Sequence, residues 1–123
     1  MEAGYTFLLT QVDDHLWVIL SDPNQDPREI LVVSITTWRE GKDPACMIER
    51  GEHPFVTHRS CLAYIEARVL SRDNFYTLKD GGHLKLQEPV SNELLGRMRE
   101  AAAKTQNLKP AFKEILQRQG LVP

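Results

Sequence analysis

The chain has 123 residues, of which 41% are hydrophobic and 26% are charged, and its formal net charge at pH 7 is -2. This length and composition predict one soluble globular domain over residues 1–123, with a core large enough to fold without a metal or a disulfide. They exclude a strongly basic nucleic-acid-binding chain, and the lack of an apolar run of roughly 20 residues excludes a membrane helix.

Short runs rich in β-branched and aromatic residues dominate the first part of the chain, with turn residues between them. Such runs predict strands, here at residues 5–12, 15–20, 30–35, 45–48, 60–70 and 83–87. Asp13-Asp14 predicts a turn, and the two prolines in residues 21–27 predict a loop. In residues 60–70 the pattern alternates, so we expect one face of this strand to carry Cys61, Ala63, Ile65, Ala67 and Val69.

Helical signals begin at residue 71. Ser71 is a good N-cap for a short helix that Gly81-Gly82 ends, and Ser91 is a good N-cap for a second helix. A third helix begins near Pro110, because proline is accepted in the first turn. The second helix is expected to bury the face formed by Leu94, Leu95, Met98, Ala101 and Ala102.

The order of these elements, strands first and helices last, predicts an α+β fold. We expect a small antiparallel β-barrel with one short helix over residues 5–90, followed by C-terminal helices over residues 91–123. The first residues have neither the basic region nor the apolar core of a secretory signal, and Cys46 and Cys61 suit a reducing compartment. We therefore expect a cytoplasmic protein.

Residues 51–61 bring polar side chains together between two apolar runs. This stretch contains His53, His58 and Arg59 together with two hydroxyl groups. Loops between strands often carry chemistry, because a rigid sheet holds their side chains still. The stretch is therefore the first candidate for a functional site. The alternative is structural, with His58 as a strand-end residue and His53 as a turn residue.

Four segments carry a family resemblance, and their order along the chain is more specific than any one of them. They are an opening strand with Trp17 and Leu20 before Asp22-Pro23, the apolar strand of residues 30–37, the late strand of residues 59–70 that opens on a serine, and the Gly-rich turn and leucine-bearing helix of residues 81–95. In this order they resemble the toxins of the MazF and PemK type, a plasmid-maintenance and growth-inhibitor family with a small SH3-like barrel. The similarity covers most of residues 5–102.

The resemblance implies an SH3-like barrel and a toxin of a type II toxin–antitoxin system. It also implies a metal-independent endoribonuclease that cleaves single-stranded RNA without a cofactor. The family dimerises through its barrel, so a homodimer is expected. The expected protein partner is an antitoxin whose acidic, disordered segment fills the shared groove.

Such a reaction needs groups that move protons and groups that hold the phosphate. The resemblance makes His53 and His58 the candidate base and acid, because histidine exchanges protons near neutral pH. Arg59 or Arg28 is the candidate phosphate clamp. A hydroxyl of Thr36 or Thr37 is the candidate ligand for a phosphate oxygen. We expect the threonines and His58-Arg59 to meet at adjacent strand ends.

Two other interpretations remain open. The same barrel without catalysis is a binding module for nucleic acid or a peptide. Alternatively, Cys46, His53, His58 and Cys61 bind zinc, although their spacing fits none of the usual zinc motifs.

Aromatic side chains offer base-stacking surfaces in either RNA interpretation. Trp38, Phe55 and Tyr64 are candidates for stacking on bases, and Trp38 is the better one because it lies at a strand end. Trp17 lies inside an apolar strand and is expected in the core. His15 and His83 follow polar turns and are expected to face solvent.

Overall fold

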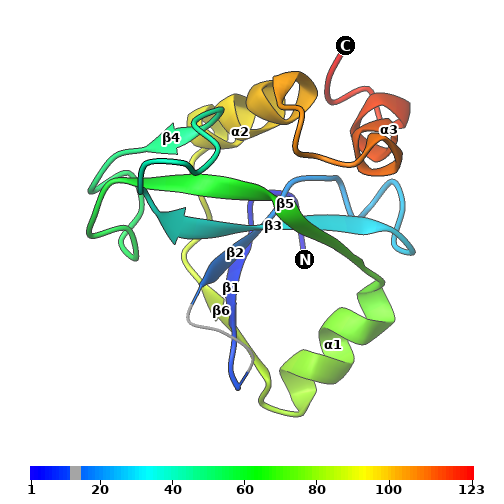
Figure 1. Cartoon of the computed structure of the whole chain (residues 1–123). Coiled ribbons are helices and arrows are strands. Elements are labelled where there is room, and N and C mark those ends of the chain that lie inside the picture. The colour runs from blue at the N-terminus through cyan, green and yellow to red at the C-terminus, as the bar shows by residue number, and fades with distance from the viewer. Residues whose placement is uncertain (12–14) are drawn as a thin grey trace.

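Six antiparallel strands form one curled sheet, a half-barrel, in the computed structural model, which describes residues 1–11 and 15–123 (Figure 1). The strands are β1 (Thr6–Leu9), β2 (Leu16–Ile19), β3 (Ile30–Thr37), β4 (Met47–Ile48), β5 (Ser60–Leu70) and β6 (Leu84–Gln87). Their order across the sheet is β4-β5-β3-β2-β1-β6, so β4 and β6 are its edges. The expected turn at Asp13-Asp14 and the expected strand end at Val12 lie outside the described residues.

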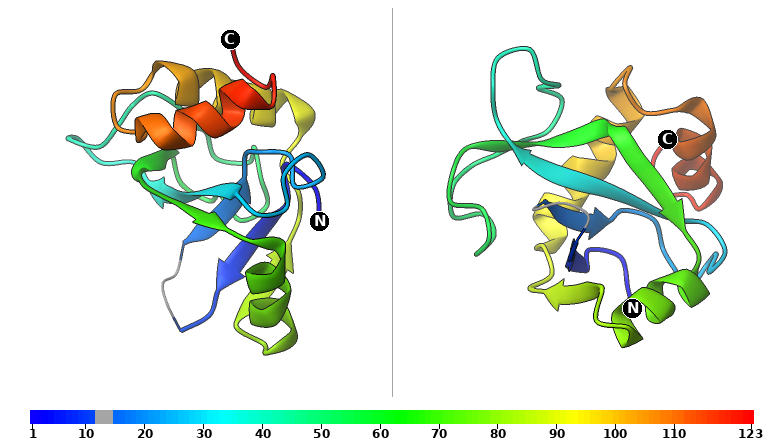
Figure 2. Two further views of the ribbon diagram at one scale, coloured as in Figure 1. Left: turned by 90° about the vertical axis from the view of Figure 1, so that its right-hand side faces the viewer. Right: turned by 60° about the horizontal axis from the view of Figure 1, so that its bottom comes forward.

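Three helices complete the α+β fold: α1 (Arg72–Asp80) lies between β5 and β6 in the chain, and α2 (Asn92–Lys104) and α3 (Pro110–Arg118) follow β6. Figure 2 shows α2 and α3 together on one side of the sheet, with α1 on the other. The expected N-caps are confirmed, since the hydroxyls of Ser71 and Ser91 each accept a backbone N–H at 3.1 Å. None of these described helices combines the length and the apolar character that crossing a bilayer demands.

The curled sheet is buried on both faces, because β3 sends alternate side chains into two separate hydrophobic clusters. Leu31 and Val33 join the cluster under α2 and α3. Ile30 and Val32 join the cluster under α1, which also contains Trp17, as expected from its apolar strand. In that second cluster the rings of Phe7 and Phe75 meet edge to face, with centroids 5.5 Å apart.

The expected alternation along β5 is wrong beyond its middle. Val32 of β3 pairs with Arg68, but Ser34 pairs with Ala63, so β5 has three more residues than β3 between these two pairs. The irregularity changes which face each later side chain reaches. Leu62 and Tyr64 pack into the α2/α3 cluster, and beyond the irregularity Ala67 and Val69 pack against that same cluster.

A buried histidine ties the two edges of the half-barrel together. His53 lies in the loop between β4 and β5 and is only 2% exposed. Its Nε2 contacts the carbonyl oxygen of Glu88, the residue that follows β6, and the hydroxyl of Thr6 donates to the same oxygen. The loop after one edge strand is thereby fixed to the end of the other.

Candidate functional site

The ends of β3 and β5 lie side by side, as the sequence predicted. Thr36 pairs with Cys61 and Thr37 pairs with Ser60. Beyond the last pair, the backbone N–H of Trp38 donates to the carbonyl of Arg59 at 2.8 Å. The loops after β3 and before β5 therefore leave the sheet at the same place, and their side chains are able to surround one volume.

A cavity of about 490 Å³ lies at this place. It is lined by His15, Ile35, Thr36, Thr37, Arg39, Lys42, Phe55, Val56, Thr57, His58 and Ser60. Three of the predicted site residues, Thr36, Thr37 and His58, therefore share one cavity. Within the described part of the chain, its lining has cationic and hydroxyl groups but no carboxylate.

Lys42 crosses from the loop after β3 to the end of that strand. Its ammonium donates to the hydroxyl of Thr36 and to the carbonyl of Thr37, both at 2.8 Å. An ammonium has three N–H donors, so these two bonds leave one for a ligand. Arg39 lines the same cavity and is exposed, with no ion pair among the described side chains.

Two imidazoles reach the cavity from different elements. His58 comes from the loop before β5 and is exposed, and its carbonyl accepts the hydroxyl of Ser60 at 2.8 Å. His15 comes from the residue before β2 and is half-buried rather than fully solvent-facing. Phe55 lies on the lining with 43% of its surface exposed, as a base-stacking side chain requires. Trp38, another stacking candidate, lies outside this lining. Tyr64 is buried, and its hydroxyl donates to the carbonyl of Met98 at 2.7 Å, so its predicted role in stacking is wrong.

The structure does not bring His53 to the cavity. Its Nδ1 accepts the backbone N–H of Phe55 at 3.0 Å, so Nε2 carries the proton and donates to the carbonyl of Glu88. Both ring nitrogens are thus used within the fold. The predicted role of His53 as an acid or base is replaced by a structural one.

The two predicted phosphate clamps also lie outside the cavity lining. Arg59 forms an ion pair with Glu49, with Nε and Oε1 2.8 Å apart, and its side chain is 62% exposed. Arg28 precedes the opposite end of β3 and lines a separate cavity beside α1. A strand rises about 3.3 Å per residue, so the length of β3 places Arg28 roughly 20 Å or more from Thr37. One phosphate therefore cannot contact both Arg28 and Thr37.

The cysteines do not support the zinc interpretation. Burial raises the pKa of the Cys46 thiol to about 11, despite the opposing effect of the Arg97 charge, and burial also raises the pKa of Cys61. His53 is turned towards Glu88. Over residues 1–11 and 15–123, no group of three or more potential metal-ligating side chains converges.

Sequence reasoning missed Arg39, Lys42 and the place of His15. The available signal for Arg39 and Lys42 was that their polar loop follows directly on the strand that ends with Thr36 and Thr37.

Comparison with known proteins finds no matching family model, no matching curated protein and no matching solved structure. The resemblance to MazF and PemK toxins therefore depends on the sequence segments alone.

Proposed function

We propose that this chain is a toxin-type, metal-independent endoribonuclease that cleaves single-stranded RNA in the cavity at the ends of β3 and β5. The observation that carries the proposal is the shared lining: Thr36, Thr37 and His58 meet Arg39 and Lys42 in one volume. Among the described lining residues no carboxylate opposes these cations. A phosphodiester is the ligand whose charge and oxygen atoms this lining fits.

In the proposed reaction, one imidazole takes the proton of the ribose 2′-hydroxyl as the 2′-oxygen bonds to phosphorus. The bond from phosphorus to the 5′-oxygen breaks, and the leaving oxygen takes a proton from the other imidazole. His58 and His15 are the two imidazoles on the lining. Lys42 and Arg39 stabilise the charge that builds up on the phosphate oxygens.

The proposal changes the residue roles that the resemblance implied. Arg39 and Lys42 replace Arg28 and Arg59 as phosphate ligands, because only the former pair lines the cavity. His53 is not assigned a catalytic role. The proposal retains the SH3-like barrel, the homodimer, the cytoplasmic location and an antitoxin partner, whose acidic segment would fit the cationic lining.

The test is an RNA cleavage assay with purified protein in excess EDTA. We expect a labelled single-stranded RNA to be cut and the 5′ fragments to end in a 2′,3′-cyclic phosphate. The Arg28→Ala variant is the control, because Arg28 is exposed beside a different cavity and should cleave normally. RNA that stays intact and unbound at high protein concentration contradicts the proposal.

The second candidate function is a binding module that holds single-stranded RNA without cutting it. The hydrogen bond from Lys42 to the hydroxyl of Thr36 favours this function, because it already occupies a group that would otherwise face the phosphate. Exposed Phe55 supplies a stacking surface that binding alone would use. RNA that is bound but uncut in the same assay supports this second function.

A further inference from the structure

A second cavity, of about 500 Å³, adjoins the first, and Lys42 lines both. The two cavities share His15, Thr36 and Lys42 on their linings, so they are direct neighbours. Each is large enough for the base and sugar of a nucleotide, whereas a single phosphate would fill only part of either. An extended ligand centred on Lys42 would therefore occupy both.

The irregularity in β5 supplies the characteristic side chains of the second cavity. Ile65 and Glu66 lie between Ala63 and Arg68, where β5 has its extra residues, and both line this cavity. Ile65 is 73% exposed, the largest value among the exposed large hydrophobic residues. Glu66 is also exposed and has no ion pair or hydrogen bond within the structure that is described. An apolar surface and an available carboxylate thus lie next to each other.

The second cavity differs from the first in charge. Its lining includes the carboxyl groups of Asp43 and Glu66, whereas the described lining of the first cavity has none. Asp43 is already engaged, because it accepts the hydroxyl of Thr105 at 2.6 Å and the N–H of Ala45 at 2.9 Å. Burial acts to raise the pKa of Asp43, but these hydrogen bonds outweigh it and the net shift is downward. Two carboxylates repel a phosphate and attract hydrogen-bond donors.

We propose that the second cavity is a base-binding subsite that selects guanine, with the adjoining phosphate held at Lys42. This inference rests on the proposed function and deepens it by naming the base. Guanine presents two adjacent donors, N1–H and the N2 amino group, which one carboxylate accepts together. Uracil, cytosine and adenine each place an acceptor beside the corresponding donor. Glu66 is the acceptor, and Ile65 and Ala63 give the ring an apolar surface.

The test measures binding of fluorescent 2′-O-methyl oligonucleotides, which cannot be cleaved because the attacking hydroxyl is capped. An oligouridine with a single guanine is compared with plain oligouridine and with the inosine version, which lacks the N2 amino group. We expect the guanine oligonucleotide to bind about tenfold more tightly than the other two, the discrimination of one bidentate contact. Glu66→Gln should remove the preference for guanine, so that the three oligonucleotides bind this variant equally. Glu2→Gln, the same change at an exposed residue of a different cavity, should retain it.

Each outcome has a definite meaning. Equal binding of the three oligonucleotides by the unmodified chain, together with cleavage of ordinary RNA, overturns the guanine subsite and leaves the proposed function standing. A preference that survives in Glu66→Gln also overturns it, provided that circular dichroism shows the variant folded. Failure to bind or cleave any RNA overturns the proposed function and this inference together.

Discussion

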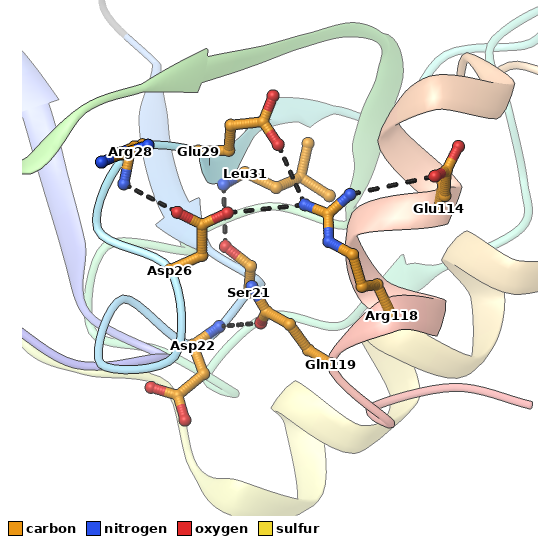
Figure 3. Close-up of polar contacts among 9 residues, drawn as sticks. All are labelled: Ser21, Asp22, Asp26, Arg28, Glu29, Leu31, Glu114, Arg118 and Gln119. Carbon is orange, nitrogen blue, oxygen red and sulfur yellow. Dashed lines mark hydrogen bonds and ion pairs between the residues drawn. The ribbon is translucent and has the colours of Figure 1, made fainter.

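Charged side chains cluster at both ends of β3, but the two ends differ in how those charges are balanced. At the Ile30 end, Arg118 of α3 approaches the carboxylates of Asp26 at 3.5 Å, Glu29 at 2.9 Å and Glu114 at 3.9 Å (Figure 3). At the Thr37 end, the described lining of the cavity has cations without a carboxylate. The charge of Arg118 at one end is therefore paired within the fold, whereas Arg39 at the other end has no ion pair among the described side chains and is available to a ligand.

Hydrogen bonds also join chain segments at the Ile30 end. The backbone N–H of Asp22 donates to the side-chain oxygen of Gln119 at 2.8 Å, and the N–H of Leu31 donates to the hydroxyl of Ser21 at 2.8 Å (Figure 3). Arg28 lies in this network, where its backbone N–H donates to Asp26. Cationic side chains occur at both ends of β3, so residue type alone does not distinguish the two ends, whereas the balance of charge around those side chains does.

The largest expected effect is at the Thr37 end. Replacing His58 with alanine removes one of the two proposed proton-transfer groups, so we expect the proposed RNA cleavage to slow by about a thousandfold. His83→Ala is the matched control, since His83 is exposed and lies outside the cavity lining. Cleavage rates measured under single-turnover conditions check the prediction. Equal rates for the two variants would remove His58 from the mechanism.

The next effect, on stability, tests whether α3 is an integral part of the Ile30 end. Leu116 is fully buried in the cluster that α2 and α3 cover. Leu116→Ala should lower the free energy of unfolding by about 2 to 5 kcal/mol, through lost burial and the cavity left behind. Urea denaturation measures this change, with exposed Gln117→Ala as the control. A loss below about 1 kcal/mol would mean that α3 is only loosely attached.

A smaller effect concerns the buried residues beside the Thr37 end. The pKa of Cys46 is raised from 9.0 to about 11 by burial, because the fold disfavours the thiolate. Between these values the unfolded chain has released the proton and the folded chain has not, so the stability from Cys46 is lost as pH rises. We expect a loss of about 2 kcal/mol from pH 9 to 11. Urea titrations of the wild type and Cys46→Ala across this range should show a shallower decline in the variant, and parallel curves would contradict the prediction.

The smallest effect is expected where the charges are compensated. The ion pairs of Arg118 lie near the surface, with 47% of its side chain exposed, and exposed pairs contribute little. Arg118→Ala should therefore lower the free energy of unfolding by less than about 1 kcal/mol and leave RNA binding unchanged. Urea denaturation and the oligonucleotide assay measure the two quantities. Reduced RNA affinity in this variant would show that the Ile30 end takes part in binding.

Local patterns were enough to predict most of the fold. The strand of residues 60–70 and the N-caps Ser71 and Ser91 were located correctly, because their residue types act within a few positions along the chain. The change of face within β5 was not predictable, since it depends on how many residues β3 places opposite it. Alternation in one strand contains no information about its partner.

The site was predicted only in part. Thr36, Thr37 and His58 share one cavity, as their positions at the ends of two neighbouring strands predicted. His53 was assigned a catalytic role because it is a histidine in a polar loop, but its partner Glu88 is far away in sequence and could not be foreseen. The contribution of Lys42 depends on the path of a loop back over β3, which residue types alone do not specify.

The pairing of β1 with β6 determines when the sheet can be completed during synthesis of the chain. Thr6 pairs with Gln87, so β1 has only β2 to pair with until residue 87 has been synthesised. Glu88, which anchors His53, emerges one residue later. Contacts this distant in sequence form slowly. A chain made only up to this point would have an open sheet edge at β1 and an unanchored loop before β5, so we expect the proposed nuclease to be inactive until β6 and Glu88 have been synthesised.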